Sequence, residues 1–342
     1  MAARMGAPVL GAICNAGHEG GQSGLSGPVT TNLSTAARWQ VTTSYRWQNS
    51  YRHFRGDHEE TQRIEQGTEV ENALHLFDFS LSYQATPRWS FQLSAPFMTV
   101  ERTSHRNATV TGSTGIGDMA VGAKVWIWRP PSENRQNVQL GFSLKLPTGD
   151  PNVTNRVGAN TITVDQSIQL GDSGTGLSLD YMVYKSLQRF TIFTTGAYLF
   201  NPKNTHAPTG WERVEPEPPG IGYRGYSSPG TVYSVADQYL LQAGLGFAVP
   251  KPAGLALTVT GRVEGVPARD IIGREDGFRR PGYAVSVGPG FMFSYGQHTW
   301  SASVPIAVRR DRTESVSDVS RGAHGDAAFA DYILLLSYSK SF

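Results

Sequence analysis

Hydrophobicity alternates with a period of two along most of this sequence, and this pattern constrains the fold more than any other feature. In the segment 39–48, tryptophan, valine and tyrosine occupy most of one set of alternate positions, and polar side chains occupy the other. The segments 77–84 and 89–97 repeat the pattern on either side of a tight turn. Alternation of this kind predicts β-strands with one apolar face and one polar face.

The alternation continues to the end of the chain and predicts about twelve antiparallel strands. The further segments are 121–127, 138–146, 177–183, 190–200 (less regular than the others), 239–247, 255–263, 283–295, 300–308 and 332–342. Short connections are expected near 86–88, 129–136, 187–189, 249–254 and 296–298. Long connections are expected over 53–71, 102–116, 147–173, 202–233, 267–281 and 310–327.

Short and long connections alternate along the chain, as they do in bacterial outer-membrane barrels with short periplasmic turns and long extracellular loops. The sequence therefore predicts an all-β transmembrane barrel. Mean hydropathy is −0.31, and no apolar run is long enough for a membrane-spanning helix. A barrel tolerates such a composition because only alternate residues of each strand face lipid.

The main alternative fold is a soluble β-sandwich or a water-soluble barrel, with the apolar faces turned inward. Strand composition argues against it, because the apolar faces begin or end with Trp, Tyr or Phe. Such girdles are expected where an apolar band meets two layers of lipid headgroups. The fourteen tyrosines and seven tryptophans of the chain fit this arrangement.

The barrel is expected to occupy residues 37–342, after an N-terminal segment, 1–36, that carries a weak signal pattern and a flexible composition. Cys14 is the single cysteine, so a disulfide scaffold is excluded. A formal net charge of +2 gives no basic footprint for nucleic acid. The expected partners are outer-membrane lipid and lipopolysaccharide, the outer-membrane assembly machinery and a small-molecule solute.

Charged residues on the polar strand faces are candidates for the lumen wall. They are Arg46, Asp78, Lys124, Lys145, Asp180, Arg262, Glu264 and Arg309. Both signs occur, so the interior is expected to be a mixed network rather than a filter of one sign. Lys124 and Lys145, on neighbouring strands, are expected to form a basic patch. The alternative is that the charges pair across the barrel and fill it.

The last strand ends in alternating aromatic and aliphatic residues that include Tyr338 and Phe342. A terminal aromatic of this kind resembles the signal that the outer-membrane assembly machinery reads by strand addition. The alternative is an ordinary edge strand that happens to end the chain.

Three glycine-rich motifs carry a resemblance to a known family. They are Gly115-Ile-Gly-Asp-Met-Ala-Val-Gly-Ala-Lys124, Gly141-Phe-Ser-Leu-Lys-Leu-Pro-Thr-Gly-Asp150 and Leu170-Gly-Asp-Ser-Gly174. Together with Phe342 they resemble the outer-membrane family of the meta-pathway of phenol degradation, over roughly residues 70–342. The resemblance implies an outer-membrane channel or transporter, found beside operons for aromatic or hydrophobic compounds. It supplies no catalytic residues and no cofactor.

Other candidate sites have weaker support. His53, His58, Glu59 and Glu60 lie in one expected loop, but their spacing matches no standard metal site, and a solvated loop is expected instead. Three acidic residues of the third long loop could hold calcium but lack regular spacing, namely Asp150, Asp165 and Asp172. No metal site is therefore predicted.

The function predicted from the sequence is an outer-membrane channel or transporter for small, hydrophobic or aromatic solutes, not an enzyme. One alternative is an outer-membrane enzyme of the lipase or protease type, although no histidine lies in a nucleophile motif. The other is a surface structural or adhesive barrel, based on aromatic residues of one long loop, Trp211, Tyr223 and Tyr226.

Overall fold

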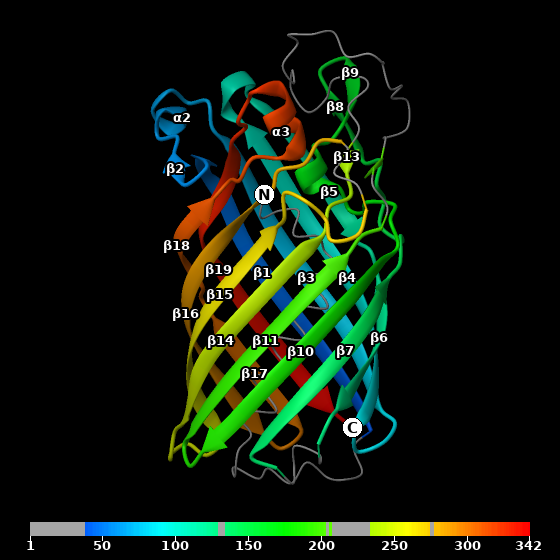
Figure 1. Cartoon of the computed structure of the whole chain (residues 1–342), viewed down its shortest axis with the longest axis vertical. Coiled ribbons are helices and arrows are strands. Elements are labelled where there is room, and N and C mark those ends of the chain that lie inside the picture. Colours follow the sequence, from blue (N-terminus) through cyan, green and yellow to red (C-terminus); the bar gives the residue numbers. More distant parts are fainter. Residues whose placement is uncertain (1–37, 129–133, 203–204, 207–232, 274–276) are drawn as a thin grey trace.

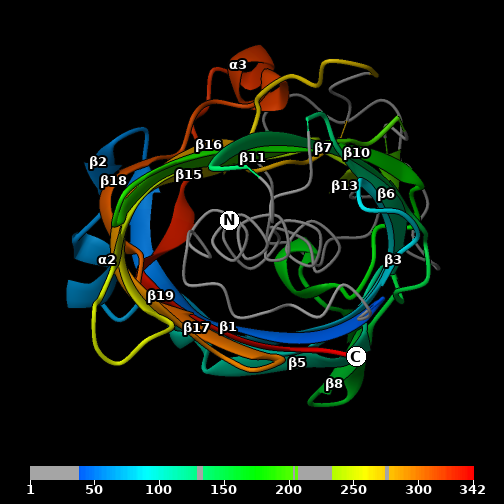
Figure 2. The ribbon, with the colours of Figure 1, turned by 90° about the horizontal axis from the view of Figure 1, so that it is seen from below.

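The protein is a closed antiparallel β-barrel of twelve strands (Figures 1 and 2). The structure, a computed structural model, describes residues 38–128, 134–202, 205–206, 233–273 and 277–342. The expectations for the N-terminal segment 1–36, for Cys14 and for the aromatic loop around Trp211 lie outside the described residues. None of the helices in the described ranges is long and apolar enough to cross a membrane.

The barrel wall is built from consecutive strands that pair in chain order. They are β1 (Trp39–Arg55), β3 (Val70–Gln84), β4 (Trp89–Ser104), β5 (Thr109–Ile116), β6 (Ala120–Trp126), β7 (Gln136–Lys145), β10 (Gly176–Leu187), β11 (Phe190–Phe200), β14 (Gln238–Ala248), β15 (Leu255–Val266), β16 (Gly282–Tyr295), β17 (His298–Ser303), β18 (Ile306–Asp311) and β19 (Ala327–Ser341). β5 and β6 both pair with β4 and form one interrupted strand, as do β17 and β18 between β16 and β19.

Short elements lie in the connections between the wall strands. They are β2 (His58–Glu59), α2 (Gln62–Glu65), η2 (His105–Asn107), β8 (Thr154–Val157), β9 (Asn160–Thr163), η4 (Gln166–Ile168), β12 (Thr205–His206), β13 (Tyr233–Ser234) and α3 (Val316–Arg321).

The barrel closes by pairing its first and last strands. β1 pairs with β19 from Gln40–Ser341 to Phe54–Ala327, and the Phe342 amide donates to the Trp39 carbonyl at 2.8 Å. Closure pairs the ladder groups of both terminal strands, so the wall has no free sheet edge at this seam.

Side chains on the wall follow the alternation seen in the sequence, with the apolar set outside. On β3, Phe79 is 50% exposed and Asp78 is 2% exposed. On β4, Phe91 and Leu93 are exposed, whereas Ser94 is buried. An apolar exterior around a polar interior fits a wall surrounded by lipid and is the reverse of a water-soluble barrel. The predicted fold class is therefore confirmed.

Two sequence expectations about the strands were wrong. The expected loop 102–116 contains β5, and β4 extends to Ser104. Three residues that separate β5 from β6 break the alternation, so the pattern appears to end there. The expected continuous strand 300–308 is interrupted at Val304 and Pro305, because a proline has no amide hydrogen to donate to the ladder.

Candidate solute pathway

The connection between β7 and β10, residues 146–175, turns back into the barrel; we call it loop 3. It carries the β8–β9 hairpin and the short helix η4. Figure 2, a view along the barrel from its short-turn end, shows a green helical turn of this connection inside the ring of strands. Within the described residues, loop 3 therefore contributes a helical turn to the lumen.

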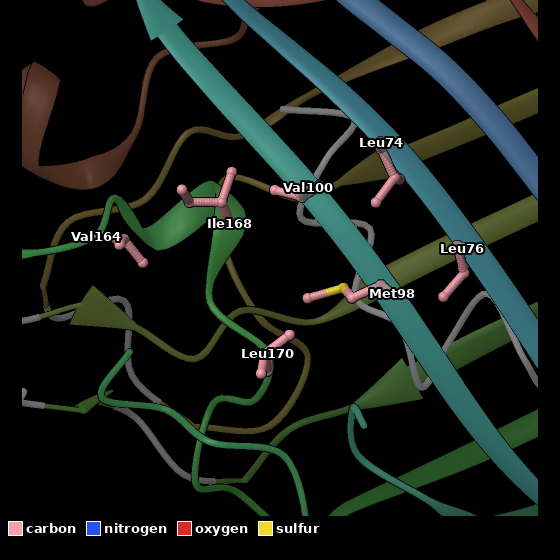
Figure 3. Packing of buried hydrophobic residues seen from close by; sticks show 7 residues of the cluster. All are labelled: Leu74, Leu76, Met98, Val100, Val164, Ile168 and Leu170. Carbon is pink, nitrogen blue, oxygen red and sulfur yellow. The ribbon is translucent and has the colours of Figure 1, made fainter. Parts of the chain in front are cut away.

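One side of loop 3 covers an apolar patch on the inner wall. We define the wall patch as Leu74 and Leu76 of β3 with Val100 and Met98 of β4. In the ladder, Leu74 lies opposite Val100 and Leu76 lies opposite Met98. The patch packs against three side chains of loop 3, which Figure 3 shows on the lumen side of β4: Val164, Ile168 and Leu170. Contact between loop and wall therefore buries apolar area on both partners.

Ion pairs hold η4 against the lumen wall. Asp165 precedes the helix, and its carboxylate accepts two bonds from Arg280 at 3.0 and 2.9 Å. Arg102 of β4 lies 3.7 Å from the same carboxylate. Burial acts to raise the pKa of Asp165, but the charges of Arg102 and Arg280 outweigh it and hold that pKa well below its usual range. The carboxylate is therefore ionised at neutral pH.

The three glycine-rich sequence motifs converge where loop 3 leaves the wall. Lys145 ends β7, and its Nζ lies 2.6 and 2.5 Å from the two carboxylate oxygens of Asp172. Its distance to Asp118, in the break between β5 and β6, is 3.8 Å. The same Asp118 carboxylate accepts the Gly149 amide at 2.9 Å. The motifs of the family resemblance thus build one polar anchor for loop 3.

Glycines are required at this anchor because two backbones approach closely. A Cβ on Gly149 would lie 2.5 Å from the Leu170 carbonyl oxygen, and one on Gly171 would lie 2.4 Å from the Gly149 carbonyl oxygen. Backbone atoms cannot move aside as the end of a flexible side chain can, so any larger residue would push the two segments apart.

Loop 3 also completes the barrel wall beside β5. β7 ends at Lys145, opposite Ala120, and among the described strands β5 pairs with β4 alone. Its other edge meets loop 3, where the Gly112 amide donates to Asn155 Oδ1 at 2.5 Å and the Ser113 hydroxyl donates to the Ile168 carbonyl. Loop atoms thus take bonds that a neighbouring strand would otherwise supply.

A pocket remains on the other face of η4; we call it the residual pocket. Its lining comes from loop 3, the start of β14 and the segment before it, the end of β15 and the residues before β16. The lining residues are Gln166, Ser167, Asp172, Ala236, Gln238, Val266, Arg279 and Arg280. Arg279 is paired with Asp270 at 2.7 Å, and Arg280 is paired with Asp165. The lining therefore combines apolar side chains, neutral donors and ion-paired arginines.

A charged network lies on another part of the inner wall. Arg46 of β1 donates to Glu264 of β15 at 2.9 Å, and Arg262 Nε donates to the same carboxylate at 2.8 Å. The Arg46 and Glu264 side chains are 0% and 4% exposed. β16, β17–β18 and β19 separate β1 from β15 around the wall, so this ion pair bridges strands that are not neighbours.

Most of the predicted lumen residues lie buried on the inner face of the wall. These are Arg46, Asp78, Lys124, Lys145, Asp180, Arg262 and Glu264. Asp78 accepts a bond from Ser94 at 2.6 Å, so this carboxylate also has a partner across the ladder.

The prediction for Arg309 was wrong. Arg309 lies opposite Val285, on the outer face, and a register shift between Val285 and Ser286 interrupts the pairing of β16 with β18. The Arg309 side chain is 56% exposed, and Arg310 is the buried residue. A bulge places two residues of one strand against one of its partner, so strict alternation fails after it.

The expected basic patch of Lys124 and Lys145 is also not formed. Lys124 lies opposite Gly141, and Lys145 lies opposite Ala120. The two lysines are therefore four ladder positions apart, about 13 Å at the rise of a strand. Lys145 belongs to the anchor of loop 3 instead.

The histidines and acids of the first loop take separate partners. His53 Nδ1 lies 2.8 Å from Asp326, Glu59 pairs with Arg52, and Glu60 pairs with Arg55 at 3.0 Å. Burial acts to raise the pKa of Asp326, but the hydrogen bond from His53 and nearby positive charges lower it to about 2. Of these contacts, the one between His53 and Asp326 ties the end of β1 to the start of β19.

The residues proposed as an assembly signal lie at the seam of the barrel. Tyr338 Oη lies 2.7 Å from His298 Nδ1 of β17, and the Phe342 side chain is 53% exposed. Tyr338 lies opposite Trp300 of β17, near the short connection between β16 and β17, and Phe342 ends the chain where Figure 1 marks the C-terminus.

The wall patch is the functional candidate that the sequence analysis missed. The segment counted as a strand began at residue 77, but the alternation extends back through β3 to Val70. Leu76 and Leu74 are in phase with Asp78, on the face otherwise occupied by polar residues. This change from polar to apolar within one face is the signal that points to a covered inner surface.

The fold is similar to that of one solved outer-membrane channel. The crystal structure of the COG4313 outer membrane channel from Pseudomonas putida F1 is 13% identical, with a TM-score of 0.60, and covers 90% of this chain and 96% of that chain. Two others have TM-scores below 0.5. The translocator domain of the autotransporter NalP from Neisseria meningitidis is 12% identical, with a TM-score of 0.46 and 97% of each chain covered. The toluene transporter TbuX from Ralstonia pickettii is 10% identical, with a TM-score of 0.45, and covers 94% of this chain and 93% of that chain.

Sequence comparison gives a more specific result. No curated protein matches this sequence. Residues 62–315 match the family described as "Putative MetA-pathway of phenol degradation", and this range contains all three motifs that build the anchor of loop 3. The match spans most of the chain, and the chain therefore belongs to this family.

Proposed function

We propose that this protein is a passive channel of a Gram-negative outer membrane for small solutes, including uncharged aromatic ones. The observation that carries the proposal is the lumen itself: a closed wall, apolar outside and polar inside, surrounds a loop that leaves a pocket beside it. The similar Pseudomonas putida structure is described as an outer membrane channel, which supports the same function.

The lining of the residual pocket favours a small solute with both polar and apolar parts. Ala236 and Val266 offer apolar contact, and Gln238 and Ser167 offer hydrogen bonds. The chemistry of phenol, one hydroxyl on an apolar ring, matches this combination, because binding sites for small molecules are mostly apolar with a few placed polar groups. No cofactor enters this proposal.

The environment proposed for the barrel is outer-membrane lipid and lipopolysaccharide, with the short turns on the periplasmic side. Tyr338 and Phe342 are proposed to be read by the assembly machinery. Sidedness is tested with single cysteines in a Cys14→Ala background. An impermeant maleimide should label Ser320→Cys on intact cells and should leave Ala253→Cys unlabelled; reversed labelling would contradict the orientation.

An enzyme is the second candidate, and one contact favours it. Ser173 Oγ lies 2.9 Å from His206 Nδ1, and His206 Nε2 lies 3.2 Å from the Pro151 carbonyl oxygen. A serine beside an oriented histidine is the geometry of nucleophile activation. A fluorophosphonate probe separates the two functions: a channel predicts no labelling, whereas labelling abolished by Ser173→Ala would establish a nucleophile.

Planar-bilayer recording tests the channel directly. Protein refolded into detergent and shown to be folded by its heat-dependent electrophoretic mobility should give discrete conductance steps. A heat-unfolded sample of the same preparation should give none. Folded protein that inserts and produces no steps would contradict the proposal.

A further inference from the structure

The wall patch is unusual for its position on the inner face. Its four side chains are almost completely buried, although Asn72 and Asp78, the neighbouring inward positions of β3, are polar. At one end, Arg102 donates to Asn72 at 3.0 Å. At the other end, Ser94 donates to Asp78 at 2.6 Å. The patch is thus an apolar surface bounded by two polar pairs.

The patch is covered by side chains of loop 3 rather than by another strand. Ile168 is 0% exposed, and Val164 and Leu170 lie beside it in the same cluster (Figure 3). Each of these aliphatic groups is of the size of a small hydrocarbon molecule. Loop 3 therefore places on the wall the kind of group that an apolar solute would place there.

The ion pairs that hold this cover lie beside the patch, and the Ser113 hydroxyl bonds to the backbone carbonyl of Ile168 and leaves its side chain unbonded. Asp165 is fixed by Arg280 and Asp172 by Lys145, and Ile168 stands between these two anchors. A short segment held at both ends can shift its apolar side chains while both ion pairs remain. A solute that takes the place of one of these side chains keeps the wall patch out of water.

We propose that the wall patch is a binding subsite for small uncharged apolar solutes of the size of a single aromatic ring, occupied by Ile168 and Leu170 when no solute is bound. This inference rests on the proposed function and deepens it by naming the solute class and the surface. Charged solutes are excluded, because none of the four side chains can pair with a charge.

Shortening the covering side chain tests the subsite. Ile168→Ala should leave an apolar cavity at the patch, and such cavities stay dry and bind aromatic molecules. We expect the variant to bind toluene at least about tenfold more tightly than the wild type, a difference that calorimetry on the detergent-solubilised protein can measure. Leu199→Ala is the matched control, because Leu199 is a buried inner-wall residue of β11 that belongs to a different apolar cluster.

A second variant tests whether toluene binds at the wall patch rather than in a cavity elsewhere. Adding Val100→Thr to Ile168→Ala keeps the shape but places a hydroxyl in the patch, and toluene binding should fall back toward the wild-type level. Toluene binding by Ile168→Ala that is no tighter than binding by Leu199→Ala, or that is unaffected by Val100→Thr, would overturn the subsite. Wild-type conductance steps would still stand in that case, so failure of the subsite is distinguishable from failure of the channel.

Discussion

Inward side chains that are buried in the lumen need partners, and two sides of the lumen supply these partners in different ways. Between β1 and β15, the inward side chains are charged, and Arg46 and Arg262 share the carboxylate of Glu264 as their counter-charge. Between β3 and β4, the inward side chains of the wall patch are apolar and are covered by Ile168 of loop 3. The first side is completed by the strands themselves, and the second needs a loop.

The comparison indicates which side of the lumen can change its conformation. Strand positions are fixed by the ladder, so the charged network is as rigid as the wall. Loop 3 is held by contacts of its side chains, and loops open locally at a lower free energy than the strands of a sheet.

The largest effect is expected from Glu264→Gln. This change leaves the buried Arg46 and Arg262 without their shared counter-charge and should cost about 3–5 kcal/mol of stability. Thermal unfolding in detergent measures the loss, and Glu65→Gln, exposed on α2, is the control that should stay within about 0.5 kcal/mol of the wild type. An unfolding midpoint equal to that of the control would show that the network contributes nothing to stability.

A somewhat smaller effect is expected from Lys145→Met at the anchor of loop 3. Asp118 and Asp172 then face each other without a cation, and about 3 kcal/mol should be lost. Unlike Glu264→Gln, this variant should also raise the conductance, because loop 3 is released from the wall. The control is Lys185→Met on the exposed face of β10. A destabilised variant with unchanged conductance would separate the anchor from the position of loop 3.

The face on which each side chain of a strand lies is the feature that the sequence predicts best, because it depends on alternation along the chain. The alternation at 77–84 placed Asp78 inside and Phe79 outside, as the structure has them. The bulge that turns Arg309 outward could not be predicted, since a register shift depends on the partner strand.

The site was harder to predict because its residues meet over long chain separations. Arg46 and Glu264 are 218 positions apart, and Lys145 reaches Asp172 across the whole of loop 3. Periodicity gives the face on which a charge lies but not the charge that faces it across the lumen. The sequence motifs did mark the anchor of loop 3, but their convergence appears only in three dimensions.

A moderate effect is expected from Asp165→Asn. The amide keeps the shape of the side chain but removes the charge that Arg280 and Arg102 face, so about 1–2 kcal/mol should be lost. Conductance should fluctuate between two levels as η4 leaves the wall and returns. Asp57→Asn, at an exposed loop position, should leave a steady record. A steady Asp165→Asn record would mean that apolar contact with the wall patch alone holds loop 3.

The smallest effect is expected from pH. Because the folded-state pKa of Asp165 is lowered, its contribution to stability is present above the usual aspartate pKa, near 3.9, and is lost only as pH falls through the lower folded value. The difference in conductance between the wild type and Asp165→Asn should therefore be the same at pH 8 and pH 5. A reversible rise near pH 6 that Asp165→Asn abolishes would contradict this assignment.

The most direct test of the account is to remove the inward part of loop 3 and record the conductance. Replacing residues 153–169 by a short glycine-serine linker deletes β8, β9 and η4 but keeps Lys145, Gly149 and Asp172 at the anchor. If loop 3 sets the width of the pathway, the folded variant should conduct at least about threefold more per step than the wild type, because conductance follows the narrowest section of a pore. Equal steps from wild type and variant, both shown to be folded, would contradict the claim that solutes pass beside loop 3.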